Sequence, residues 1–204
     1  ILEKIIGHKK QELANAQAVH PLKELMKSKL YGRKTLSLTE SIQNEEKTGI
    51  IAEFKRKSPS RGLINGQAIL EEVTTGYFRS GASGLSILTD QEFFGGTNED
   101  LLRARELNLI PILRKDFVID EYQVVEAKAI GADAILLIAA VLDIGQTRNL
   151  ARLARSLDLQ VLLEVHQAAE LDHLNEFINM VGVNNRDLHT FAVDVERSVQ
   201  MADE

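Results

Sequence analysis

Apolar residues along this chain occur as short runs that alternate with longer amphipathic stretches. Six of the short runs predict β-strands, at residues 50–54, 85–88, 110–113, 134–138, 161–165 and 180–183. Apolar residues at helical spacing predict helices between these strands, at residues 67–80, 98–107, 121–130, 144–157 and 168–177. Strands that alternate with helices predict a parallel sheet with right-handed crossovers. Doubly wound sheets and (β/α)8 barrels both have this alternation.

A helical leader precedes the first predicted strand. Apolar residues recur at helical steps from Leu2 to Ala16, on a stripe that Lys9 interrupts. His20 and Pro21 break this helix, a second short helix follows them, and a third begins near residue 38, with Ser37 or Thr39 as its N-cap. We therefore predict a single barrel domain over residues 1–204, with a helical extension at 1–48 and strands and helices one to six at 49–204.

Four of the predicted strands end in a pair of residues two positions apart, and each pair includes an ionisable or amide group. The pairs are Glu53 and Lys55, Lys115 and Phe117, Glu164 and His166, and Asn184 and Arg186. Alternate residues of a strand share a face, so each pair continues the inward side of its own strand. Because barrel enzymes collect their catalytic residues at the carboxyl ends of the strands, this pattern favours a barrel with an active site there. A structural ion-pair network at the mouth of the barrel is the alternative interpretation.

The residue types in these pairs are suited to acid–base chemistry. A lysine near other cations has a lowered pKa and can act as a general acid, whereas a glutamate at a partly dry rim has a raised pKa and can act as a base. The guanidinium of Arg186 fits a planar carboxylate, because it donates to both oxygens at once. Asp90 and Asp116 also follow strands, and we expect helix-capping or supporting roles for both.

Composition narrows the possible partners. A net charge of -6 argues against nucleic-acid binding, and no apolar run approaches the ~20 residues that span a membrane. The absence of cysteine excludes disulfides, thiolate metal sites and a cysteine nucleophile, and is compatible with the cytoplasm. We find no histidine pair at metal-ligand spacing, no nucleotide-binding glycine motif and no serine-nucleophile motif. The sequence therefore predicts neither a metal nor a cofactor.

Five segments together resemble one enzyme family. They are IAEFKRKSPSRG at 51–62, LTDQEFFGG at 88–96, ILRKDFVIDEYQVVEAKAIGADAILLI at 112–138, LLEVH at 162–166 and VGVNNRDLHTF at 181–191. The chain is similar over nearly its whole length to indole-3-glycerol-phosphate synthase of tryptophan biosynthesis. The resemblance implies a (β/α)8 barrel with an N-terminal helical extension over its mouth. It also implies a lyase that converts 1-(2-carboxyphenylamino)-1-deoxyribulose 5-phosphate to indole-3-glycerol phosphate, CO2 and water, without metal or organic cofactor.

The same resemblance implies roles for the catalytic residues. Lys115 would be the general acid that protonates the ribulose carbonyl as the ring closes, and Glu164 the general base in the later dehydration. Glu53 would hydrogen-bond the sugar hydroxyls, and Lys55 would hold the substrate and share the acid work.

The resemblance also implies a set of substrate-binding residues. Asn184 and Arg186 would orient the substrate, with Arg186 near the anthranilate carboxylate. Ser58 and Pro59 would belong to a mobile loop that closes over the substrate. Phe94 and Phe117 would form the apolar wall against its aromatic ring.

The sequence departs from the family in its number of predicted strands. The family has eight, and strands seven and eight, with the loops that usually grip the phosphate, are not predicted here. A barrel fragment would be weakly active or inactive and would associate with a second copy or with its missing C-terminal part. Another barrel enzyme, phosphoribosylanthranilate isomerase, is disfavoured because its acid–base pair is expected to include a cysteine.

Overall fold

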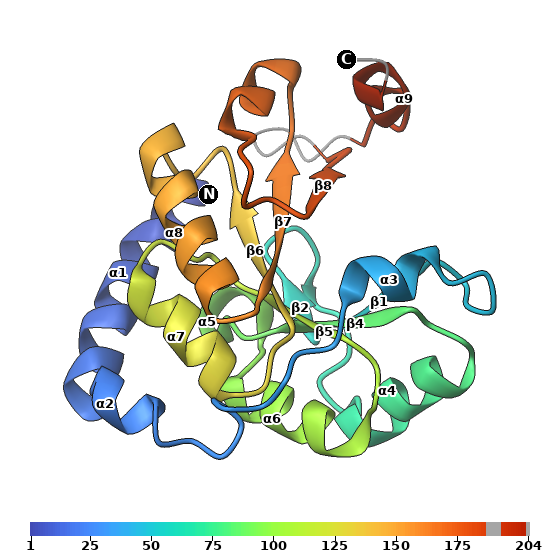
Figure 1. Ribbon diagram of the computed structural model, residues 1–204. Coiled ribbons are helices and arrows are strands. Elements are labelled where there is room, and N and C mark those ends of the chain that lie inside the picture. The colour runs from blue at the N-terminus through green and yellow to red at the C-terminus, as the bar shows by residue number, and fades with distance from the viewer. Residues whose placement is uncertain (187–192, 203–204) are drawn as a thin grey trace.

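The computed structural model describes residues 1–186 and 193–202, which form a curled sheet of six parallel strands with helices packed around it (Figure 1). The strands of this sheet are β1 (Ile51–Phe54), β4 (Gly84–Leu88), β5 (Ile112–Lys115), β6 (Ala134–Ile138), β7 (Gln160–Val165) and β8 (Met180–Val183). Their order in the sheet follows the chain, and each strand pairs in parallel with the next. The order of a doubly wound sheet reverses at a switch point, so this sheet has the barrel arrangement.

Helices cover the outer face of the sheet, and the leader helices α1 and α2 pack beside α7 (Figure 1). The helices are α1 (Leu2–Val19), α2 (Leu22–Leu25), α3 (Leu38–Gln43), α4 (Leu70–Arg79), α5 (Gln91–Phe94), α6 (Asn98–Leu107), α7 (Glu121–Ala129), α8 (Ile144–Ser156), the 3-10 helix η1 (Ala168–His173) and α9 (Glu196–Ala202). A two-stranded antiparallel ribbon, β2 (Lys57–Ser58) and β3 (Gly62–Leu63), follows β1. No helix within the described ranges is both long and apolar enough to cross a membrane.

The strands contribute side chains to two apolar layers. The larger layer lies between the sheet and the outer helices, and the smaller one fills the inside of the curl. Leu113, Ile51 and Leu162 belong to the inner layer, which confirms the inward side predicted for their strands. Leu38 of α3 is fully buried in the same layer, so the leader helps to fill the barrel interior.

Most element positions agree with the sequence prediction, and two differ for local reasons. The third strand begins at Ile112 rather than at residue 110, because Pro111 has no N–H to donate and only its carbonyl accepts, from the Leu85 N–H at 2.9 Å. The helix predicted at 168–177 is wrong in type and length, since η1 ends at His173. The Asn175 side chain bonds the backbone of His173 and Phe177, and such local bonds compete with a helix.

Polar contacts hold the leader against the barrel along its length. The Tyr122 hydroxyl of α7 donates to the carbonyls of Ala16 and His20 at the end of α1. The Gln160 side chain accepts the first N–H groups of α3, whose predicted N-cap Ser37 is confirmed by its bond to the Glu40 N–H. The leader is therefore an integral part of the fold.

Candidate active site

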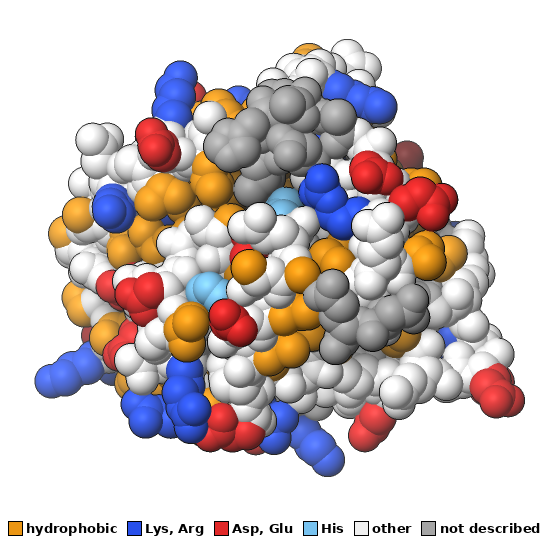
Figure 2. All heavy atoms as spheres, turned by 90° about the horizontal axis from the view of Figure 1, so that it is seen from above, with side chains coloured by type: hydrophobic (Ala, Val, Ile, Leu, Met, Phe, Trp, Pro, Cys, Tyr) orange, Lys and Arg blue, Asp and Glu red, His pale blue; other side chains and the backbone are white. Residues whose placement is uncertain are grey.

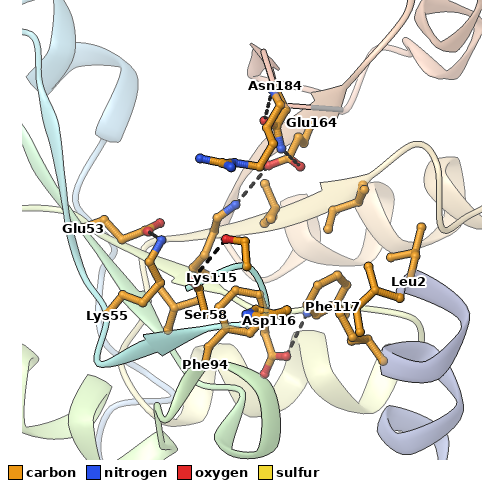
Figure 3. Close-up of a pocket in the computed structure, with 18 of the residues that line it drawn as sticks. Leu2, Glu53, Lys55, Ser58, Phe94, Lys115, Asp116, Phe117, Glu164 and Asn184 are labelled. Carbon is orange, nitrogen blue, oxygen red and sulfur yellow. Dashed lines mark hydrogen bonds and ion pairs between the residues drawn. The ribbon is translucent and has the colours of Figure 1, made fainter. Parts of the chain in front are cut away.

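A cavity of about 670 Å³ lies at the carboxyl ends of the strands (Figure 3). Every residue given a catalytic or substrate-binding role from the sequence lines it: Glu53, Lys55, Ser58, Pro59, Phe94, Lys115, Phe117, Glu164, Asn184 and Arg186. His166, the remaining member of the four predicted pairs, is not a lining residue; its Nε2 lies 3.6 Å from Glu164 Oε1. Figure 2 shows the molecule from the end toward which β7 and β8 point, with hydrophobic and charged side chains interspersed over that face. Convergence of charged strand ends on a shared cavity is the geometry that a barrel active site requires.

Lys115 of β5 and Glu164 of β7 form the central pair of this cavity. The Lys115 Nζ lies 3.0 Å from Glu164 Oε2, and the Asn184 Nδ2 donates to the other carboxylate oxygen at 3.0 Å (Figure 3). The two side chains are 26% and 13% exposed, so both are partly screened from water yet reachable from the cavity. An ammonium and a carboxylate are thus joined by one hydrogen bond at the place where a substrate would bind.

The environment of Glu164 lowers its pKa. Burial alone would raise this pKa, but the Lys115 ammonium and the hydrogen bonds from Asn184 and Lys115 outweigh burial. The expectation of a raised pKa for a glutamate at a dry rim is therefore wrong for Glu164. The reason is the ion pair that reaches across the barrel interior from β5 to β7. Glu164 is ionised at neutral pH and ready to accept a proton.

Glu53 and Lys55 form a second ion pair on the β1 side of the cavity. The Lys55 Nζ donates to Glu53 Oε1 at 2.8 Å, as expected for residues on one face of a strand end. Ser86 of the neighbouring strand β4 donates to the other Glu53 oxygen at 3.3 Å. Both members of the pair are about one-third exposed, with side-chain values of 32%. This pair is accessible to a polar ligand.

Phe94 and Phe117 come from different loops and form an aromatic wall. Their ring centroids are 6.0 Å apart and the ring planes are tilted by 40°. Phe94 ends helix α5, whose cap Gly95 has φ 68°, a left-handed conformation that favours glycine. A Cβ at Gly96 would overlap the Leu88 carbonyl, so the glycine pair allows this loop to turn closely over β4.

Ser58 and Pro59 lie on the β2–β3 ribbon at the edge of the cavity. The Arg56 guanidinium beside them makes two hydrogen bonds to Asp100 of α6, at 2.6 and 2.8 Å, which anchors the base of the ribbon. On the β8 side, the Asn184 Oδ1 accepts the Arg186 N–H at 3.0 Å, while the Arg186 side chain lines the cavity. Both segments predicted to hold substrate therefore border the same space.

Comparisons with known proteins agree with this geometry. The family model described as indole-3-glycerol phosphate synthase matches residues 2–204. The chain belongs to the indole-3-glycerol phosphate synthase family. An indole-3-glycerol phosphate synthase of Bacteroides thetaiotaomicron is 46% identical over 202 residues, which cover 99% of this chain and 77% of that protein. Synthases of Polaromonas naphthalenivorans and Albidiferax ferrireducens are 42% and 40% identical, each over 98% of this chain and 78% of the relative.

Some of the residues lining this synthase-family cavity were not predicted from the sequence. Ile1, Leu2 and Ile5 of the leader line it, and Figure 3 shows Leu2 on α1 at the Phe117 side. Their apolar stripe predicted burial, but it carried no sign that the helix borders a cavity. Arg61 lines the cavity from the ribbon; its place in the basic 51–62 segment was a usable signal.

Two aspartates, Asp90 and Asp116, support this site of the synthase family, and Asp116 also lines the cavity. Asp90 caps α5 by accepting the Phe93 N–H at 2.8 Å, so the capping role expected for it is confirmed. Asp116, also a predicted supporting residue, accepts the Phe117 N–H at 2.8 Å and is almost fully buried. Across residues 1–186 and 193–202, no group of three or more His, Cys, Asp or Glu residues has the arrangement of a metal site.

Proposed function

We propose that this chain catalyses the synthase reaction, closing, decarboxylating and dehydrating 1-(2-carboxyphenylamino)-1-deoxyribulose 5-phosphate to indole-3-glycerol phosphate in tryptophan biosynthesis. Members of its family are carboxy-lyases that act on a small phosphosugar substrate. The observation that carries the proposal is the Lys115–Glu164 pair, 3.0 Å apart within the cavity. A charged acid and base in contact suit a reaction in which protons are both given and taken.

Lys115 acts in the first step as the general acid. The aromatic carbon that bears the carboxylate attacks the ribulose carbonyl carbon, and the carbonyl oxygen takes a proton from the Lys115 ammonium. The new bond closes the five-membered ring. The carboxylate then leaves as CO2, and its bonding electrons restore the aromatic ring. A fixed cation beside the carbonyl oxygen stabilises the charge that develops there.

Glu164 acts in the dehydration as the general base. The hydroxyl formed from the carbonyl leaves as water with a second proton, which solvent supplies, while the ring loses one proton to Glu164. That proton can return to Lys115 along their 3.0 Å hydrogen bond, which restores the resting state of both groups. The lowered pKa of Glu164 supports this role, because the base must be ionised before it can act.

The remaining cavity residues bind the substrate. Arg186 faces the anthranilate carboxylate and Asn184 orients the substrate beside it, while the wall of Phe94 and Phe117 packs against the aromatic ring. This division is supported by the positions of the residues around the cavity.

On the opposite side of the cavity, Glu53 and Lys55 bind the sugar, with Lys55 sharing the acid work. Ser58 and Pro59 cover the substrate from the ribbon. The position of the Glu53–Lys55 pair at the β1 rim, one-third exposed, supports its contact with a polar ligand.

We further propose that residues 1–204 act as one barrel domain, with residues 1–48 as its extension, in the cytoplasm, where amino-acid biosynthesis takes place. The alternative of an inactive barrel fragment is not favoured, because all residues given a catalytic or substrate-binding role from the sequence meet in one cavity.

Turnover by the purified chain tests the proposal. The chain is mixed with the carboxyphenylamino-deoxyribulose phosphate, indole fluorescence is followed, and released CO2 is measured in parallel. We expect both signals to rise in equal amounts. Their absence, in protein whose fold is verified by circular dichroism, would contradict the proposed activity. Restoration of both signals by a C-terminal segment of a relative would instead support the fragment alternative.

A further inference from the structure

Lys9 of helix α1 is a buried cation inside a ring of carboxylates. Its side chain is 2% exposed, and its Nζ lies 2.9 Å from oxygens of Glu12, Asp90 and Asp116. Burial alone would lower the pKa of Lys9, but Asp116, Asp90 and Glu12 outweigh it and hold the pKa above its ordinary value. Lys9 thus lies on the buried side of α1 with the apolar residues, and barrel carboxylates balance its charge.

The first barrel partner, Asp90, fixes the loop that carries Phe94. One Asp90 oxygen caps α5 at the Phe93 N–H, and the other pairs with Lys9. The Asp90 carbonyl also accepts the Gly96 N–H at 2.9 Å, at the far end of the same loop. Asp90 fixes the start of helix α5 and so the position of Phe94, which ends that helix. Lys9 therefore binds the residue that positions this part of the wall.

The second barrel partner, Asp116, fixes the loop that carries Phe117. The same Asp116 oxygen that pairs with Lys9 accepts the Phe117 N–H. Thr89 donates to the other oxygen at 2.6 Å, and the Arg114 guanidinium lies 3.4 Å from it. Since Lys115 lies between Arg114 and Asp116, this anchor is directly beside the proposed acid.

We propose that Lys9 is a positioning residue: its ammonium joins the Asp90 and Asp116 loops, and so fixes the aromatic wall of Phe94 and Phe117 against which the substrate ring packs. The geometry explains why one lysine of the leader contacts two consecutive strand ends, β4 and β5, and why those are the loops that carry the two rings. The kinetic part of the proposal rests on the proposed function; the part that concerns the wall does not.

A tryptophan reporter tests the wall without turnover. The chain has no tryptophan, so Phe94→Trp introduces a single one into the wall. We expect Lys9→Met in this background to raise acrylamide quenching of the tryptophan about twofold or more, because the loop loses its anchor. Lys128→Met is the matched control, since Lys128 is also buried and binds the leader, at the Arg33 carbonyl, away from the cavity. It should leave the quenching unchanged.

Steady-state kinetics in the chain that retains Phe94, without the tryptophan, give the second readout. We expect Lys9→Met to raise KM about tenfold with kcat lowered less than threefold, because the wall binds the ring without touching the reacting atoms. If Lys9→Met does not fold, Asp90→Asn replaces it: the amide still caps α5 but has no charge for Lys9, and the same changes in KM and quenching are expected.

Unchanged quenching and KM in a folded Lys9→Met or Asp90→Asn protein would overturn the positioning role. An equal change in Lys128→Met would also overturn it, because the effect would then reflect general loosening of the leader. Loss of turnover in the unmodified chain would count against the proposed function alone, and the tryptophan result would still decide the role of Lys9.

Discussion

Asp133 and Glu164 are carboxylates at opposite ends of the sheet, and their partners give them different roles. Asp133 precedes β6 at the start of the strands, is fully buried and accepts two donors at each oxygen. Arg33 and the Leu36 N–H reach one oxygen at 2.6 and 2.7 Å, and Arg105 and the Ile112 N–H each reach the other at 2.8 Å.

Glu164 lies near the carboxyl end of β7 and is paired in another way. Its oxygens meet the Lys115 ammonium and the Asn184 amide, and its side chain lines the cavity. The difference from Asp133 is the chemistry of the partners. Arginine and backbone N–H groups do not release protons in proteins, whereas a lysine ammonium can. Asp133 is therefore suited to holding the leader in place, and Glu164 to exchanging protons with a substrate.

The largest effect is expected from changes at Lys115. Lys115→Ala should lower kcat by about a hundredfold to ten-thousandfold, the usual contribution of a general acid. Lys115→Arg should lose as much although it keeps the positive charge beside Glu164, because a guanidinium does not give up its proton. Rates are measured by indole fluorescence and stabilities by thermal unfolding. Appreciable activity in Lys115→Ala would assign the acid role to Lys55.

A smaller effect is expected from Asn184→Ala, in the pH dependence of kcat. The hydrogen bond from Asn184 helps to lower the pKa of Glu164 below its ordinary value of 4.5. Removal of this bond should raise the pKa, and the decline of kcat in acid should then begin at a higher pH. Between neutral pH and a pH near that decline, kcat of the variant should fall roughly three- to tenfold more than kcat of the unmodified chain falls over the same interval. An acid decline at an unchanged pH would exclude this contribution of Asn184.

The smallest effect concerns acid stability at Asp116. Burial alone would raise the pKa of Asp116, but Lys9 and Arg114 outweigh it, and the pKa lies below its ordinary value of 3.8. A carboxyl group whose pKa is lower in the folded than in the unfolded state stabilises the protein at pH values above its ordinary pKa. This stabilisation is lost as the pH falls through the folded-state pKa. The difference in unfolding free energy between wild type and Asp116→Asn should shrink below about pH 4, by about 1.4 kcal/mol per pH unit at most. Urea unfolding at several pH values measures it; a constant difference would refute the linkage.

The sequence alone predicted the barrel arrangement and most of the charged and amide residues that line the cavity. Alternation of short apolar runs with helices carried the fold, and the spacing of two at strand ends brought Glu53 and Lys55, and Asn184 and Arg186, to the same side. These predictions succeed because the alternation of side chains between the two faces of a strand is a local property. It continues for one or two residues beyond the last backbone hydrogen bond between strands.

What the sequence did not predict depends on partners that are remote along the chain. Lys9 looked like a break in an apolar stripe, since the Asp90 and Asp116 carboxylates that neutralise it belong to distant loops. The pKa of Glu164 was predicted in the wrong direction because its lysine partner reaches it from β5, across the strand that lies between. Pairings through the barrel interior are set by the curl of the sheet, which no local pattern encodes.

The most direct test of this account compares Glu164→Gln with Asp133→Asn, two changes of a carboxylate to its amide. For each variant, kcat per folded molecule and the unfolding free energy are measured in the same buffer. Glu164→Gln should lower kcat about a hundredfold or more and cost less stability than Asp133→Asn, because the Lys115 ammonium it leaves behind is partly exposed and stays hydrated. Asp133→Asn should cost about 3–5 kcal/mol of stability, because two arginines lose a buried partner, and leave kcat unchanged. Equal losses of kcat in the two variants, or a stability loss confined to Glu164→Gln, would contradict the assignment of proton chemistry to the carboxyl end of the sheet.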